Sequence, residues 1–176
     1  RAKDAARAVK DGIHQTVETI TEPTLTRLLD LAHLAVAGYA LERLGEQEVL
    51  HLFCQLTIEA AVCPSCQAIA TTIKQYKERC VRDCDTLGKR TFVHFQSRRF
   101  ECEACGCRFT EELQAVDWRR RQTRRFEHLV YQRCLHSSHK AVATELHLSQ
   151  CTVQGIFKRQ AHHRLRQPTH LVRVLG

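Results

Sequence analysis

Four cysteines stand in two pairs, and each pair has the spacing of a zinc-binding turn. The pairs are Cys63–Cys66 and Cys102–Cys105. Structural zinc takes four thiolate or imidazole ligands in a tetrahedron, and a Cys-x-x-Cys turn supplies two of them from one short loop. Residues 67–101 are long enough for a strand hairpin that brings both turns together. Because four thiolates leave no open coordination position, we predict a structural zinc ion rather than a catalytic one.

The remaining cysteines leave the metal content partly open. Cys107 competes with Cys105 as the fourth ligand, and only the matched spacing of the two pairs favours Cys105. Cys80 and Cys84 could bind a second metal, although no matching second pair accompanies them. Free cysteines also pack as small apolar side chains, an interpretation that suits Cys54, Cys134 and Cys151.

The stretch from His139 to Lys158 has the pattern of a helix-turn-helix, in which the second helix enters the major groove of DNA. Ala143 is small where the two helices should approach, and Ser149 should cap the second helix. His147 stands in the turn, where this motif often has glycine, and histidine tolerates a positive φ better than most residues.

Polar side chains of this second helix are the candidates for reading DNA. We predict that Gln150, Gln154 and Lys158 lie on the face opposite Val153 and Phe157. Glutamine can pair bidentately with adenine in the major groove. Lysine contacts phosphate more often than bases, so we expect Lys158 and the adjacent Arg159 to contact phosphate.

Five arginines precede and begin the first helix of this region: Arg119, Arg120, Arg121, Arg124 and Arg125. Cations are disfavoured at a helix N-terminus, so we expect an anion to neutralise them. The chain has a net charge of +8, and residues 116–176 hold 12 Lys/Arg but only 3 Asp/Glu. A localised positive field favours a polyanion, most often nucleic acid.

The elements that position these residues fall into a strand-rich part and a helical part. Leu28 to Glu59 predicts a strand pair with a turn at Gly45, and a helix over Leu28–Leu44 is the alternative. Ile73 to Cys84 and Arg90 to Cys102 predict two more strands, joined by a turn at residues 86–89. Asp83 and Asp85 fall near this turn, where we interpret them as solvated charges.

Helical periodicity replaces the strand pattern over residues 120–163, with Ser138 and Ser149 at N-cap positions. Residues 1–22 predict an amphipathic helix that Pro23 closes. The predicted class is therefore α+β, with a small antiparallel zinc ribbon followed by a three-helix helix-turn-helix domain. The predicted units are an N-terminal extension over residues 1–27, a ribbon over 28–115, the helix-turn-helix over 116–163 and a linker over 164–176.

Composition narrows the class of protein further. Apolar residues make up 43% of the 176 residues, which suits a packed chain, and no apolar run approaches the roughly 18 residues of a membrane span. No secretory signal accompanies the ten cysteines, so we expect metal binding in a reducing cytoplasm and no membrane partner. The chain begins at Arg1 and contains no Met, which predicts a piece of a longer protein.

The order of these motifs resembles the ISL-three family of bacterial insertion-sequence transposases, whose zinc ribbon is followed by a helix-turn-helix. The resemblance covers roughly Leu28 to Gly176. Its zinc-ribbon motifs are Cys63-Pro64-Ser65-Cys66, Arg82-Asp83, Arg98-Arg99-Phe100-x-Cys102-x-x-Cys105 and Arg108-Phe109-Thr110-Glu111, and Arg124 to Lys158 matches the helix-turn-helix. Cys80, Cys84 and Cys107 depart from the family pattern, and residues 1–22 have no counterpart in it.

The resemblance implies the DNA-recognition portion of a transposase. Similar transposases cut and join DNA with an RNase H-like core, in which three acidic residues hold two divalent metals. The first catalytic aspartate is expected just after a segment like residues 171–176. The resemblance therefore implies no catalytic residue in this chain, and a need for Mg²⁺ only in a catalytic domain that follows it. The DNA bound would be the terminal inverted repeats of the transposon. The protein would act in the bacterial cytoplasm, on nucleoid DNA. The ribbon would position the chain or pair two copies of it.

Three other functions compete with this interpretation. A zinc-dependent transcriptional regulator could be built from the same two modules. A nuclease or other enzyme has little support, because the sequence shows no clustered carboxylates with a helper base. RNA binding would suit a basic ribbon, but the helix-turn-helix favours duplex DNA.

Overall fold

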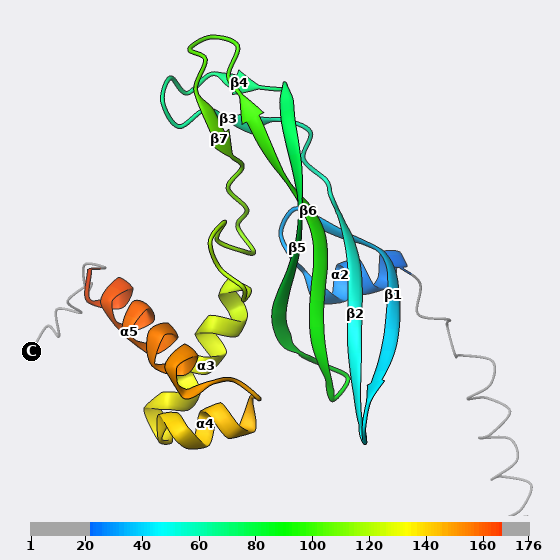
Figure 1. Cartoon of the computed structure of the whole chain (residues 1–176), viewed down its shortest axis with the longest axis vertical. Helices are drawn as coiled ribbons and strands as arrows, with labels where there is room; N and C mark the ends of the chain where they lie inside the picture. The colour runs from blue at the N-terminus through cyan, green and yellow to red at the C-terminus, as the bar shows by residue number, and fades with distance from the viewer. Residues whose placement is uncertain (1–21, 167–176) are drawn as a thin grey trace, which may run out of the picture.

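A twisted sheet of long strands forms the centre of the protein, whose computed structural model describes residues 22–166 (Figure 1). The order across the sheet is β1-β2-β6-β5, and a short β7 pairs with β6. The strands are β1 (Leu34–Leu44), β2 (Gln47–Leu56), β5 (Ile73–Thr86), β6 (Lys89–Glu101) and β7 (Arg108–Thr110). A separate small sheet pairs β3 (Ala61–Val62) with β4 (Ile69–Ala70).

Two hairpins build this sheet, and both follow from the sequence. The β1–β2 turn contains Gly45 at φ 63°, and the β5–β6 turn places Leu87 and Gly88 at φ 53° and 71°. Two consecutive residues with positive φ suit the twist of a tight hairpin. The predicted strand pairs are thus confirmed, and the alternative helix over Leu28–Leu44 is wrong beyond Leu29, where α2 ends.

The predicted purely antiparallel ribbon needs correction. β2 and β6 run parallel, with Val49 opposite Arg90 and Phe53 opposite His94. The two hairpins therefore join side by side through one parallel contact. The α+β class is confirmed, but the sheet extends well beyond the cysteine turns.

A helix packs on one face of the sheet. α2 (Glu22–Leu29) places Leu25 and Leu29 in the same core as Leu52, Val81 and Val93, of which Leu52 and Val93 are fully buried. Pro23 lies in the first turn of α2, and the helix that it was predicted to close lies outside the described residues. Proline is tolerated there because the first N–H groups of a helix have no partner within the helix.

Three helices form a second core beside the sheet (Figure 1). They are α3 (Arg124–His136), α4 (His139–Glu145) and α5 (Gln150–Arg166). The hydroxyls of Thr123 and Ser138 accept from the amides of Phe126 and Ala141, both at 3.2 Å. The Ser149 hydroxyl accepts from the Thr152 amide at 3.1 Å. Both predicted caps, Ser138 and Ser149, are thus confirmed.

The core of the helical part is apolar and closely packed. Phe126, Val142, Val153 and Ile156 are completely buried, and Ala143 is 6% exposed, as expected where helices approach. The turn before α5 places His147 at φ 53°, which confirms the expected left-handed conformation.

A buried carboxylate joins the helical part to the sheet. Asp83 on β5 is fully buried, and its Oδ1 accepts from the Thr123 hydroxyl at 2.6 Å and from Arg125 Nε at 2.8 Å. Arg125 also donates to the Leu29 carbonyl at the end of α2. We call Arg82, Asp83, Thr123 and Arg125 the β5–α3 clamp.

Arg82 completes the clamp. Its amide donates to the Arg121 carbonyl at 2.8 Å, and its carbonyl accepts from Thr123 N at 2.9 Å. Its guanidinium lies 4.9 Å from the centre of the Phe126 ring and pairs with Asp85. The interpretation as a solvated charge is therefore wrong for Asp83, which has no exposed surface. Asp85 pairs with Arg82 but keeps about half of its side chain exposed.

Two predicted segments lie outside the described residues. These are most of the N-terminal helix, residues 1–21, and the end of the linker, residues 167–176. Between them, in residues 22–166, no helix is both long and apolar enough to cross a membrane.

We expect Asp83→Asn to lower the free energy of unfolding by about 3 kcal/mol, because breaking a buried ion pair leaves a charge without compensation. Urea denaturation followed by circular dichroism measures the loss. Asp117→Asn is the matched control, since it breaks an ion pair with Arg124 in which both side chains are about half exposed. The control should change stability by less than about 1 kcal/mol. Equal losses in the two variants would contradict the clamp.

Candidate metal centre and nucleic-acid interface

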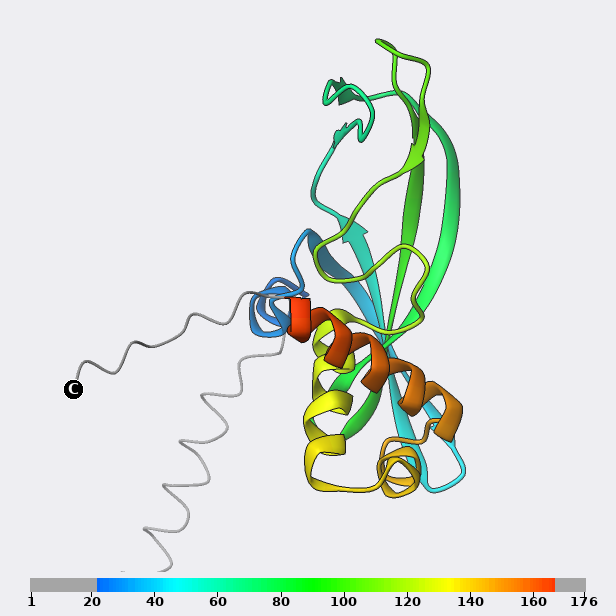
Figure 2. The same ribbon diagram turned by 90° about the vertical axis from the view of Figure 1, so that its left-hand side faces the viewer.

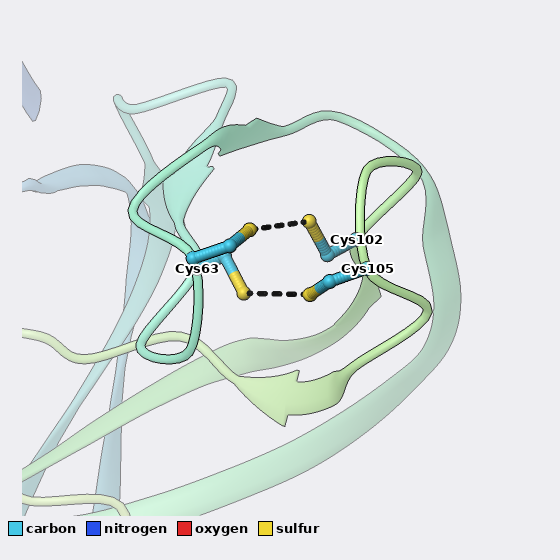
Figure 3. A group of neighbouring side chains, drawn as sticks. Cys63, Cys102 and Cys105 are labelled. Atoms are coloured by element: carbon cyan, nitrogen blue, oxygen red, sulfur yellow. Dashed lines mark hydrogen bonds between the residues drawn. The ribbon is translucent and has the colours of Figure 1, made fainter.

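The four paired cysteines converge at the end of the sheet, where two turns face each other (Figure 3). Their sulfurs all lie within 4.8 Å of one another. Cys63 Sγ is 3.7 Å from Cys105 Sγ, and Cys66 Sγ is 3.5 Å from Cys102 Sγ. Sulfurs bound at ~2.3 Å to one tetrahedral zinc ion lie about 3.8 Å apart. The cluster therefore has the dimensions of a zinc site made by four thiolates.

Both turns use the same backbone geometry. In the first, the Cys63 amide donates to Ala68 O at 2.8 Å and the Gln67 amide to Cys63 O at 3.0 Å. In the second, the Gly106 amide donates to Cys102 O at 2.8 Å. Gln67 and Gly106 occupy equivalent positions at φ 62° and 70°. Glycine adopts this conformation without strain, whereas glutamine is sterically disfavoured there.

The second turn decides between Cys105 and Cys107. Cys105 belongs to the group of four thiols that could hold a metal ion, and Cys107 does not. The Cys107 carbonyl accepts from the Cys102 amide at 2.9 Å, so Cys107 closes the turn through its backbone. Its side chain is partly buried against the small core that contains Cys63, Cys102 and Phe100. In residues 22–166, no other group of three or more such ligands comes together, and this includes the surroundings of Cys80 and Cys84.

The electrostatics of the cluster favour one thiolate before any metal binds. The amides of Cys66 and Ser65 donate toward Cys63 Sγ and lower the pKa of Cys63 to about 6. The Ala68 amide lowers the pKa of Cys66 as well, but the thiols of Cys102 and Cys105 outweigh it and raise that pKa to about 12. Zinc must therefore displace the proton of Cys66, so its affinity should fall as pH falls.

Few apolar side chains surround the cluster. Phe100 and Ala70 are fully buried beside Cys63 and Cys102, and the Phe100 and Phe109 rings stack with centres 6.0 Å apart. So small a core gains little from apolar burial alone, and the metal must supply much of the stability at this end of the protein.

We expect Cys105→Ser to reduce zinc from one ion per chain to well below one, because it removes a ligand from the tetrahedron. Cys107→Ser should keep the full content, since only its backbone takes part in the turn. Elemental analysis of purified protein measures both. Loss of zinc from Cys107→Ser with retention in Cys105→Ser would reverse the ligand assignment.

At the other end of the protein, α5 exposes part of the predicted reading surface. Gln150 and Lys158 are exposed and Gln154 is partly exposed, while Val153 and Ile156 are buried. Phe157 does not lie opposite Gln150 as predicted. Gln150 and Phe157 are seven positions apart, which is nearly two turns, so both side chains lie on the same side of the helix. Phe157 is partly buried, and its ring stacks on Tyr131 with centres 5.3 Å apart.

Carboxylates within the protein hold three of the predicted DNA-contacting arginines. Arg125 binds Asp83 in the clamp, and Arg124 Nε donates to Asp117 Oδ1 at 2.8 Å. Arg159 Nη2 donates to Glu127 Oε1 at 2.6 Å, and Glu127 is 5% exposed. The expectation that an external anion must neutralise the whole cluster is therefore wrong, because Asp83 and Asp117 neutralise part of it.

The other arginines of the cluster remain open to solvent to different degrees. Arg119 and Arg121 are exposed, and Arg120 is partly exposed. The Arg119 guanidinium lies 4.2 Å from the centre of the Trp118 ring, which is 51% exposed. None of these three forms an ion pair with another residue between 22 and 166. They and Lys158 are among the cations of this region that have no carboxylate partner in residues 22–166.

Several residues that carried the family resemblance turn out to form buried contacts. Arg82 and Asp83 belong to the clamp. Arg98 donates from Nε to Glu111 Oε2 at 3.0 Å, and its amide donates to Glu111 Oε1 at 2.7 Å. This second ion pair is almost completely buried and fixes the segment after β7 to β6. Sequence reasoning missed both pairs, because their partners lie far apart along the chain.

The models of two known protein-domain families match consecutive parts of the chain. Residues 59–105 match the zinc-finger of transposase IS204/IS1001/IS1096/IS1165. Residues 106–161 match the helix-turn-helix domain of transposase family ISL3. No curated protein and no solved structure matches the chain.

The fold, the cysteine cluster and the two matches define a zinc-binding, DNA-binding part of a transposase. The chain belongs to family ISL3, the ISL-three family whose motifs its sequence resembles. The matched ranges meet between Cys105 and Gly106, inside the second cysteine turn, so the helix-turn-helix match includes β7 and the segment that leads to α3.

Proposed function

We propose that this chain binds double-stranded DNA sequence-specifically at the terminal inverted repeats of its transposon. It would serve as the DNA-recognition part of a DDE-type transposase. The observation that supports this most is the state of α5, whose apolar side is buried in the helical core while Gln150 and Lys158 are exposed. A recognition helix needs such a free polar side to contact base edges.

The roles within the interface follow from side-chain chemistry. Gln150 and Gln154 would read base edges, and Lys158 would contact phosphate. Arg119, Arg120 and Arg121 would neutralise phosphates beside the recognised site. Arg124, Arg125 and Arg159 are held by carboxylates, so we assign them mainly to positioning α3 and α5, with a direct DNA contact only where their exposed edges reach phosphate.

The other units have supporting roles in this proposal. The ribbon and sheet over residues 28–115 form one unit, which zinc stabilises at its end, and the three helices over 116–163 form the helix-turn-helix. A pair of chains would place two recognition helices on repeated half-sites. Mg²⁺ would serve only a catalytic domain that follows residues 164–176. The proposed place of action is the bacterial cytoplasm, on nucleoid DNA.

Nuclease footprinting on DNA that carries the element's ends tests the proposal. Protection within the terminal repeats is the expected result, and the molar mass of the complex reports whether one or two chains bind. Protection confined to a promoter would instead indicate a transcriptional regulator. Tighter binding to double-stranded RNA than to DNA would contradict the proposal as well.

We expect Gln154→Ala to reduce discrimination between the best site and random duplex by about tenfold, because a bidentate contact to a base contributes about 1–3 kcal/mol. Fluorescence anisotropy with a duplex selected from a random-sequence library measures both affinities. Lys158→Gln is the matched variant on the same helix. It should weaken binding to all duplexes and lower the salt slope by about 0.9, the value for one phosphate contact. If Gln154→Ala weakened both duplexes equally, Gln154 would not read bases.

A further inference from the structure

A basic groove lies on the sheet, away from the helix-turn-helix. It has a volume of about 750 Å³ and runs over β5 and β6, between the zinc ribbon and the segment that follows β7. Its cationic lining residues are Lys77, Arg79, Arg99 and Arg108, and Trp118 lies at its wall. We call it the sheet groove. Its lining contains none of the four clustered cysteines and no residue of α3, α4 or α5.

Strand register brings the cations of the groove together. Lys77 and Arg79 alternate on β5 and so share one face of the sheet. Lys77 pairs with Ser97, and Arg99 two residues further along β6 lies on the same face opposite Gln75. Ser97 is 4% exposed and small, so it forms a floor between the longer basic side chains.

The charge of the groove is poorly compensated. Lys77 and Arg99 are exposed, and neither forms an ion pair with any residue of the described range 22–166. Arg108 pairs with Glu101 at 2.7 Å, and Glu112 is the acidic member of the lining. Exposed cations crowded without acidic partners favour an anion from outside the protein.

The groove continues toward the helix-turn-helix. A second depression is lined by Asp117, Arg119, Arg120 and Arg124, and it shares Glu112 and Trp118 with the sheet groove. Trp118 therefore stands where the cations of the sheet meet those of the arginine cluster. In the view of Figure 2, the segment between β7 and α3 lies in front of the sheet, and so does helix α5.

Hydrogen bonds hold this junction in place. Arg79 Nη2 donates to the Asp117 carbonyl at 3.0 Å and also to the Arg120 carbonyl. Its guanidinium lies 5.3 Å from the centre of the Phe95 ring, on the sheet. The position of Trp118 and of the arginines beside it is therefore fixed relative to Lys77 and Arg99 before any ligand binds.

We propose that the sheet groove binds the sugar–phosphate backbone of duplex DNA that flanks the site read by α5. The inference rests on the proposed function and extends the contact from the helix-turn-helix to the sheet. Lys77 and Arg99 neutralise phosphates, and the exposed ring of Trp118 packs against the backbone between them and Arg119. A path for single-stranded DNA would offer successive aromatic platforms, whereas Trp118 is the exposed aromatic residue of this lining.

Two duplexes of different length test the proposal, both carrying a site selected from a random-sequence library with the full chain. The short duplex ends at the borders of the site, and the long one extends it by about one helical turn, roughly 10 bp, on each side. The wild-type chain should bind the long duplex more tightly. The double variant Lys77→Gln/Arg99→Gln should lose this advantage and keep its affinity for the short duplex. On the long duplex its salt slope should fall by about 1.8, the value for two phosphates.

The matched control is Arg43→Gln/Lys74→Gln, which also removes two exposed positive charges from the sheet but outside the groove. It should behave like the wild type on both duplexes, and zinc content should stay at one ion per chain in every variant. An unchanged salt slope for the groove variant on the long duplex would overturn the proposal, as would a length effect seen only with single-stranded extensions. Loss of selective binding to the short duplex by the wild type would instead overturn the proposed function, and this inference with it.

Discussion

The buried carboxylate of Asp83 determines where the helix-turn-helix sits. It receives hydrogen bonds from Thr123, the cap of α3, and from Arg125 in the first turn of α3, while Arg125 also bonds to the end of α2. One side chain on β5 thus links the sheet, the helix packed on it and the helix that begins the DNA-binding part. A charge buried this completely is costly unless every bond to it is made. The orientation of α3 and α5 relative to the sheet therefore depends on a few polar contacts rather than on a broad apolar interface.

Apolar burial and the cysteine cluster stabilise different parts of the protein. The sheet with α2 and the three-helix part each have a core of large apolar residues, such as Leu52 and Val93 in one and Phe126 and Ile156 in the other. The ribbon has two cysteines, Ala70 and Phe100 in its buried centre. A metal ion held by the cysteine cluster would thus stabilise one end of the molecule. The strands β5 and β6 pass from that end into the apolar core, so they connect a metal-dependent region to a metal-independent one.

Local patterns in the sequence were sufficient for much of this structure. The cysteine spacing picked out the four thiols that lie together, the two hairpins followed from strand-forming residues around turns, and Ser138 and Ser149 capped helices as expected. The failures involve contacts between distant residues. Nothing near Asp83 shows that Arg125 will reach it, and Glu127 and Arg159 meet only after α3 packs on α5. The parallel pairing of β2 with β6 is likewise decided by tertiary packing. Arginines in a row therefore suggested one basic surface, whereas in the folded chain Arg124, Arg125 and Arg159 bind carboxylates of the protein itself.

The length of β5 has a geometric consequence. The strand begins at Ile73, beside the zinc ribbon, and reaches the clamp at Arg82. At ~3.3 Å per residue this segment measures about 30 Å, close to the ~34 Å of one helical turn of B-DNA. Because this strand is hydrogen-bonded within the sheet, its length fixes the distance between the zinc ribbon and the clamp. A duplex lying along it would turn the same side of its helix toward both ends, so the spacing of contacts on DNA would be set by the number of residues in one strand.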